Sequence, residues 1–524
     1  MEDNTLLLYN GKFITLNPDR PIVDWIYISN GYIADMGMDD GYKKYEKEAQ
    51  CLNIKGNWAL PGFIDSHVHL VQSGLNILAN SLNNCYSIKE ILDSIKRAKA
   101  EESSFGLIIR CVGLEEIKLK ESRMPTRWEL DSTESERMVW ISTVDYQITI
   151  VNTQAFKFLN LPFNLDGIER DGRGIPTGVL TGRANFIARK KLLGIIPDSI
   201  RKQGVDIALD NAIRQGVTTV HAMEGGFLFH DRDAELIHEN MNKFPIDVEL
   251  FFQTTDISKV EAMGLNRIGG SIFLDGSFQA RSAALEYPYE DMEKTRGELY
   301  FSDNEIESLI FTGIQKGMDT TVHAVGSRAI GQILNVYYRA KKAFPSSKSR
   351  MRIEHFELPN LNQIELASKL NVILSMKPAC EYFWGGEGKT YAKRLGKIRA
   401  KRTNPNATII ANGGIIAGGS ESDLTPINPL LGIYSALNHP TKEERISNLE
   451  ALKMFTINGA IAVGQEDTKG KLDLEYLADI CILNTNPLEY NAERIDEIVV
   501  LGTIKAGKIL FISDEIADWR DTLA

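Results

Sequence analysis

The chain has 524 residues, 43% of them hydrophobic and 25% charged, which is the composition of a soluble globular protein with more than one domain. Its formal net charge of −11 argues against a nucleic-acid partner, because phosphate binding generally requires a basic face. The five cysteines lack Cys-x-x-Cys spacing and no apolar run approaches the roughly 20 residues that span a bilayer, which argues against disulfides, secretion and membrane insertion and predicts a cytoplasmic protein.

Both ends of the chain contain short β-rich segments. Those within residues 5–60 are separated by Asn10-Gly11 and Asn30-Gly31, dipeptides that favour hairpin turns. Segments at 479–483, 497–501 and 508–512 have the same character. We expect residues 1–58 and 468–524 to join into one composite β-sandwich domain.

The segment 61–69 is the most informative in the chain. An apolar β run, opened by Pro61-Gly62, ends in His67 and His69. Side chains two apart on a strand point to the same face, so both imidazoles can bind one divalent metal ion. Asp65, two residues before His67, points to the same face of the strand and is expected to orient these ligands. The alternative is that both histidines are hydrogen-bonded residues of the core.

Short apolar runs alternate with helix-like segments through the centre of the chain, which is typical of parallel βα units. Eight runs end in polar residues, the number that a closed barrel requires: 63–69, 218–223, 247–253, 268–275, 320–323, 352–355, 372–376 and 415–420. We therefore predict an α/β fold, a (β/α)8 TIM-like barrel over 59–467. Residues 80–200 are predicted to be an insertion after the first strand, near the barrel mouth and the substrate pocket.

Catalytic residues of such barrels lie at the C-terminal ends of the strands. His67, His69, His323 and His355 end three of the runs, and Glu421 follows the eighth. Imidazoles with a nearby carboxylate predict a catalytic metal centre that leaves a position open for water.

Other residues near the strand ends carry weaker signals. His221 ends the second run and is either a ligand or a contact to the ligands or substrate. Asp275 either bonds the substrate or a ligand histidine, or only opens a turn. Trp384, with its aromatic neighbours, forms either a wall for an aryl or acyl group or ordinary packing. The cationic stretch 393–402 is interpreted as a solvated helix face, with contact to an anionic substrate group as the alternative.

Several motifs, in order, resemble the metal-dependent amidohydrolase superfamily, in particular the amidohydrolase-3 or YtcJ-like branch that includes N-substituted formamide deformylases. The resemblance covers nearly the whole chain. It rests on Pro-Gly-Phe-Ile-Asp-Ser-His-Val-His at 61–69, Gly-Val-Thr-Thr-Val-His at 216–221, Leu-Asp-Gly-Ser at 274–277, His-Ala-Val-Gly-Ser-Arg-Ala-Ile at 323–330, Arg-Ile-Glu-His at 352–355, Phe-Trp-Gly-Gly at 383–386, the segment 418–433 and Leu-Ala-Asp-Ile-Cys-Ile-Leu at 477–483.

The resemblance implies a barrel with a composite β-sandwich and a divalent metal, expected to be Zn²⁺, at His67, His69, His323 and His355. It implies hydrolysis of a non-peptide C–N bond in a small-molecule substrate, an N-acyl or N-formyl amide. Homo-oligomers are common in the family, and the sequence leaves the subunit count open. Alternatives on the same scaffold are a heterocycle deaminase, a cyclic-amide hydrolase and a non-catalytic scaffold protein.

Three departures from the family pattern concern the site. Glu421 stands where the family usually has the aspartate of Gly-Ser-Asp, and we favour it over Asp423 as the proton shuttle. Ser271 stands where many relatives have a carboxylated lysine that bridges two metals, so one ion is favoured over two, with Glu224 as an alternative bridge. Gly-Ser-Arg at 326–328 replaces the usual Gly-Asp-Arg.

Overall fold

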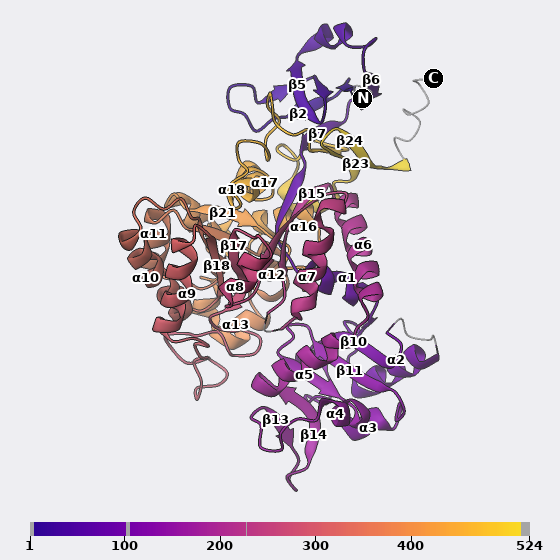
Figure 1. Cartoon of the computed structure of the whole chain (residues 1–524), viewed down its shortest axis with the longest axis vertical. Helices are drawn as coiled ribbons and strands as arrows, with labels where there is room; N and C mark the ends of the chain where they lie inside the picture. The colour runs from indigo at the N-terminus through magenta and orange to yellow at the C-terminus, as the bar shows by residue number, and fades with distance from the viewer. Residues whose placement is uncertain (1–4, 101–104, 227, 515–524) are drawn as a thin grey trace. The chain divides into compact units, whose positions relative to one another are not determined.

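The computed structural model describes residues 5–100, 105–226 and 228–514 (Figure 1). The chain forms two compact units. The first comprises Met1–Val68, Leu209–Met223 and Asn240–Ala524, and the second His69–Ala208 and Glu224–Glu239.

Eight parallel strands form the barrel, and their spatial order follows the chain. They are β8 (Phe63–Val68), β15 (Val217–Glu224), β16 (Asp247–Phe252), β17 (Arg267–Phe273), β18 (Asp319–Ala324), β19 (Met351–His355), β20 (Ile373–Met376) and β21 (Ile415–Gly418). The two ends of the sheet meet where Val68 bridges Ser422 and the Glu421 amide donates to the His67 carbonyl at 3.0 Å. Each predicted run corresponds to one strand, so the predicted barrel is confirmed.

The strands are almost fully buried, as expected of a parallel sheet whose two faces are both covered. Helices of the first unit cover the strands, and α9 and α10, the longest of them, are amphipathic. Helix α9 begins with a capping box in which Ser302 accepts from the amide of Glu305. The covering helices are α8 (Ile257–Ala262), α9 (Asp303–Gln315), α10 (Ser327–Ala343), α11 (Leu361–Lys369), α15 (Asn406–Ala411), α16 (Pro429–Leu437), α17 (Asn448–Met454) and α18 (Ile457–Ile461). Three further helices follow β20, namely α12 (Pro378–Trp384), α13 (Thr390–Leu395) and α14 (Lys397–Ala400).

Two terminal sheets share one hydrophobic core. The first has the order β5-β4-β1-β6, from β1 (Thr5–Tyr9), β4 (Trp25–Ser29), β5 (Tyr32–Gly37) and β6 (Gln50–Asn53). The second has the order β24-β23-β22-β7-β2-β3, from β2 (Lys12–Ile14), β3 (Ile22–Val23), β7 (Trp58–Pro61), β22 (Ile480–Leu483), β23 (Val500–Lys505) and β24 (Lys508–Ile512). N-terminal β7 pairs with C-terminal β22, so strands from both ends lie side by side (Figure 1). Asn30 and Gly31 both have positive φ, the geometry that a two-residue hairpin turn requires.

The second unit has a six-stranded sheet of its own, in the order β13-β14-β12-β11-β10-β9. The strands are β9 (Asn80–Ser81), β10 (Ile108–Leu114), β11 (Met138–Thr143), β12 (Ile148–Val151), β13 (Ile168–Arg170) and β14 (Pro176–Thr181). The helices are α1 (Leu70–Ile77), α2 (Ile88–Ala100), α3 (Arg127–Asp131), α4 (Thr153–Leu159), α5 (Gly182–Gly194) and α7 (Asp231–Asn240), while α6 (Asp198–Arg214) leads into β15. A separate core of isoleucine and leucine side chains lies between α2 and this sheet.

All five cysteines are buried and none forms a disulfide. Across residues 5–100, 105–226 and 228–514, no helix has both the length and the apolar character needed to cross a membrane.

Candidate metal centre

Three histidines and one glutamate converge at the C-terminal end of the barrel. His67 lies in β8, His323 in β18 and His355 at the end of β19, while Glu421 follows β21, and all four are buried. The ring centres of His323 and His355 are 4.3 Å apart, and those of His67 and His355 are 5.8 Å apart. The structure therefore brings these predicted residues together. His69 follows β8 directly and caps α1.

The Glu421 carboxylate faces two imidazoles at once. Its Oε2 lies 3.1 Å from His67 Nε2, and its Oε1 lies 3.4 Å from His355 Nε2. Ligand atoms of His67, His69 and Glu421 all lie within 4.8 Å of one another. Imidazole nitrogens and a carboxylate are the donors that zinc binds in catalytic sites, so these residues fit a divalent ion.

Two further glutamates hold the opposite nitrogens of the same rings. His67 Nδ1 lies 2.6 Å from Glu354 Oε2, and His355 Nδ1 lies 3.1 Å from Glu357 Oε1. The His67 ring can be neutral with its Nδ1–H donating to Glu354, which keeps the lone pair of Nε2 for a metal. Both rings are therefore oriented so that Nε2 points toward Glu421. Burial lowers the pKa of His355, but Glu421 and Glu357 outweigh it and raise this pKa to about 9, so a metal would have to displace a proton from this ring.

Glu354 is surrounded by buried donors. Arg352 Nε lies 2.5 Å from Oε1, Lys377 Nζ lies 3.1 Å from Oε2, and the Thr321 hydroxyl donates to Oε1 at 2.8 Å. Burial alone raises the pKa of Glu354, but Arg352 and Lys377 outweigh it and hold this pKa well below the usual range. Glu354 is therefore an ionised carboxylate bonded to His67.

Four charged residues of this centre were not predicted from the sequence, namely Glu354, Glu357, Arg352 and Lys377. A signal was present, because Arg352 and Glu354 lie inside a predicted barrel strand and Lys377 directly follows another. Charged residues are rarely fully buried unless they are paired. A charge within a predicted barrel strand was thus a reason to look for a partner.

Glu421 adopts a backbone conformation that is uncommon for a residue with a side chain. Its φ is +57°, in the left-handed region, and strained residues of this kind cluster at functional sites. Its amide is fixed to the His67 carbonyl. Asp423, the other predicted proton shuttle, is half-buried two residues further on. The geometry favours Glu421, whose carboxylate faces both imidazoles.

Asp65 and Asp275 bind backbone amides at the strand ends. Asp65 Oδ1 accepts from the amides of Ser420 at 2.9 Å and of His67 at 3.2 Å, so it joins the first and last strands. Burial raises the pKa of Asp65 to about 6. Glu354, rather than Asp65, contacts the His67 ring.

Asp275 binds three amides, those of Ala284 at 2.8 Å, Val325 at 3.0 Å and Gly326 at 2.8 Å. Its Oδ1 lies 3.9 Å from His323 Nε2, and burial raises its pKa to about 7. The carboxyl group of Asp275 therefore contacts the loop 326–328, where Gly-Ser-Arg replaces the family's usual Gly-Asp-Arg.

His323 has its two ring nitrogens in different surroundings. Nε2 lies 3.4 Å from the Gly276 carbonyl, while Nδ1 is buried and has no hydrogen-bond partner among the described residues. Burial holds the pKa of His323 well below its usual range, and the nearby His355 lowers it further. His323 is therefore a neutral imidazole with a nitrogen available to a ligand.

His221 is turned toward Arg352. Its Nδ1 lies 3.0 Å from Arg352 Nη1, and its ring packs against Phe251. Burial and the Arg352 charge keep its pKa well below the usual range, so the ring is neutral. Because Arg352 also bonds Glu354, His221 supports the carboxylate that orients His67.

The remaining predicted residues lie as follows. Glu224 accepts from the Val71 amide at 3.1 Å, at the first turn of α1, and burial raises the pKa of this carboxyl well above the usual range. Trp384 is buried at the end of α12 against Phe383. The side chain of Ser271 lies outside the described part of the structure.

The cationic stretch forms α13 and α14 and is paired within the protein. Arg394 bonds Asp291, and Lys397 Nζ lies 2.5 Å from Glu387. These contacts favour the interpretation as a surface helix face.

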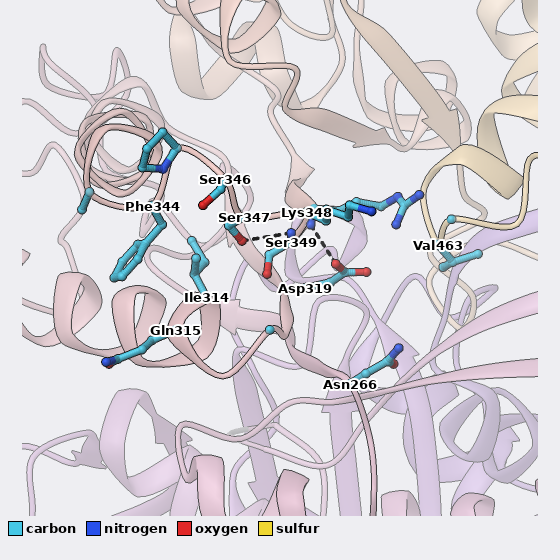
Figure 2. A pocket seen from close by; sticks show the side chains of 15 residues that line it. Asn266, Ile314, Gln315, Asp319, Phe344, Ser346, Ser347, Lys348, Ser349 and Val463 are labelled. Carbon is cyan, nitrogen blue, oxygen red and sulfur yellow. Dashed lines mark hydrogen bonds between the residues drawn. The ribbon is translucent and has the colours of Figure 1, made fainter.

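A separate cavity of about 650 Å³ has a lining that includes Asn266, Phe344 and Val463. Figure 2 shows these side chains. The lining also includes Asp319, the first residue of β18, and the loop 345–350, whose Arg350 amide donates to Asp319 at 2.7 Å. Catalytic groups of such barrels lie at the C-terminal ends of the strands. This cavity is therefore distinct from the centre formed by the histidines.

The sequence model of the Amidohydrolase family matches residues 50–511. The chain belongs to the amidohydrolase family. This amidohydrolase is 27% identical over 537 residues to the putative amidohydrolase YtcJ of Bacillus subtilis (strain 168), covering 96% of this chain and 99% of that protein. It is 22% identical over 550 residues to the N-substituted formamide deformylase of Arthrobacter pascens, covering 97% and 98%.

The amidohydrolase fold also occurs in a solved structure. The crystal structure of an uncharacterized metal-dependent hydrolase from Pyrococcus furiosus superposes with a TM-score of 0.74 and 26% identity, covering 93% of this chain and 100% of that one. The predicted resemblance to the YtcJ-like branch is confirmed. The protein is a metal-dependent hydrolase of the amidohydrolase superfamily.

Proposed function

We propose that this hydrolase cleaves the C–N bond of small N-acyl or N-formyl amides, with Glu421 as the proton shuttle. The observation that carries the proposal is that two imidazoles, each held at Nδ1 by a glutamate, direct Nε2 toward one carboxylate. The name of the formamide deformylase relative supports the choice of amides over other substrates.

His67, His69, His323 and His355 would hold a divalent ion, which we expect to be one Zn²⁺. Such an ion lowers the pKa of water and polarises a carbonyl. In this proposal Glu421 accepts the proton of the attacking water and returns it to the leaving nitrogen. Burial excludes bulk solvent from these groups and strengthens their electrostatic interactions.

The proposal extends to the protein's partners, compartment and oligomeric state. The net charge of −11 disfavours a nucleic-acid partner. We propose a cytoplasmic enzyme that acts on a small molecule without a nucleic-acid or membrane partner, and a homo-oligomer by analogy with the family.

The test is an activity assay on four classes of substrate that differ in the C–N bond to be cleaved: N-formyl amides, N-acetyl amides, cyclic amides and aminated heterocycles. We expect amine release from the first two classes, abolished by a chelator and restored by Zn²⁺. Ammonia release from the heterocycles alone would identify a deaminase instead. Zinc-loaded protein that cleaves none of the four classes would contradict the proposal.

A further inference from the structure

Lys377 is a fully buried lysine that directly follows β20. Its Nζ lies 3.1 Å from Glu354 Oε2 and 3.9 Å from Glu421 Oε2. A buried ammonium must be paired, because taking an isolated charge out of water is costly. One of these two carboxylates, Glu354, bonds the His67 ring, and the other, Glu421, is the proposed proton shuttle.

Hydrogen bonds at Nζ and the backbone at the start of α12 both restrict the position of this ammonium. Nζ donates to the Ser375 carbonyl at 2.7 Å and to the Ser375 hydroxyl at 3.1 Å. The Lys377 backbone caps α12, and Pro378 occupies the first helical position, where its ring restricts φ. A side chain that is normally flexible is thus held in one place.

Glu354 Oε2 accepts from both Lys377 Nζ and His67 Nδ1, and Arg352 Nη2 lies 3.2 Å from the same oxygen. A displacement of the ammonium therefore moves the acceptor that orients the His67 ring. We propose that Lys377 is a positioning residue that holds Glu354, and through it His67, in the correct place relative to Glu421. The inference rests on the proposed function, because it assumes that His67 binds a metal.

Removing the Lys377 charge should leave the fold intact. Glu354 keeps its 2.5 Å contact with Arg352 and the hydrogen bond from Thr321, so its charge remains compensated. Methionine has a similar length and no charge. The Lys377→Met variant therefore removes the ammonium without leaving a large cavity.

Lys505 offers a matched control. It is also buried and bonds carboxylates, with Nζ 2.9 Å from Asp479 and 2.8 Å from Asp247. Asp247 begins β16, so this pair lies at the opposite end of the barrel strands from Lys377. Lys505→Met removes a buried lysine without touching the metal centre.

Cobalt(II) reports on ligand geometry without needing a substrate. Metal-free wild type, Lys377→Met and Lys505→Met are titrated with Co²⁺ while the d–d absorption bands are recorded. We expect Lys377→Met to bind Co²⁺ about 10–100-fold more weakly, with altered bands, because residues that orient ligands have effects of this size. Lys505→Met should match the wild type.

The outcomes distinguish the positioning role of Lys377 from the proposed metal-dependent function. A Lys377→Met protein with wild-type bands and affinity would overturn the positioning role and leave the proposed function standing. A wild type that shows no cobalt bands would overturn the metal centre and, with it, both claims. If Lys377→Met fails to fold, Ser375→Ala removes the hydroxyl that accepts from Lys377 Nζ at 3.1 Å and from Arg352 Nη2 at 3.1 Å, the two cations that hold Glu354. This variant should weaken binding in the same direction, and unchanged binding would overturn the inference.

Discussion

Glu421→Gln is expected to lower kcat by about 10²–10⁴-fold while the metal remains bound. Glutamine keeps the size and an amide oxygen, so it can still face His67 and His355. It cannot accept a proton from water or return it to the leaving nitrogen. The measurements are steady-state kinetics on the best amide substrate and the metal content of the purified variant.

Asp423→Asn is the matched control for this prediction. Asp423 is half-buried and two residues from Glu421, so its loss should change kcat by less than the loss of Glu421. If Glu421→Gln keeps a near wild-type kcat while Asp423→Asn is inactive, the proton shuttle is Asp423.

Glu354→Ala is expected to lower the free energy of unfolding by about 3–5 kcal/mol, because removing one partner of a buried ion pair leaves charge uncompensated. Here the charges left behind are Arg352 and Lys377, both buried. The measurement is denaturant unfolding of metal-free protein, so that weaker metal binding does not contribute to the difference.

The matched control is Glu307→Ala. Glu307 contacts Arg339 at 2.8 Å, but both side chains are partly exposed to water. Loss of such a surface pair changes stability by only about 0–1 kcal/mol. A Glu354→Ala effect no larger than that of Glu307→Ala would mean that the buried charges are compensated in another way.

The barrel could be predicted because parallel strands that are covered on both faces have continuous apolar sequences. Runs such as 63–69, 247–253 and 372–376 carry this signal, and polar residues mark where the strands end. The pairing of β7 with β22 brings together segments that are far apart in the chain, Trp58–Pro61 and Ile480–Leu483. The sequence predicted that the two β-rich ends join, but it did not indicate which strands pair, because no local pattern specifies such a partner.

The candidate site was predictable in part. His67, His69, His323, His355 and Glu421 were found because barrel topology places strand ends together. The carboxylate that contacts His67 Nδ1 was not found, because Asp65, two residues before His67 on the same strand, points to the same face and was preferred. The actual partner, Glu354, reaches His67 from β19, which is not a neighbour of β8 in the sheet. Contacts across the barrel interior depend on the stagger and tilt of the strands, which a sequence does not show.

The buried position of Lys377 also could not be predicted from the sequence. A single lysine after an apolar run is usually solvated, since lysine is almost never fully buried unless paired. Its partners Glu354 and Glu421 come from two other segments, and only the folded barrel places them around the ammonium.

We propose that His67, His69, His323 and His355, beside Glu421, surround one divalent ion. The most direct test is an anomalous difference map from a crystal of zinc-loaded protein. We predict one peak, about 2.0–2.1 Å from His67 Nε2 and within ligand distance of the other imidazoles. A map with no peak among these residues, from crystals whose zinc content is confirmed, would contradict the account.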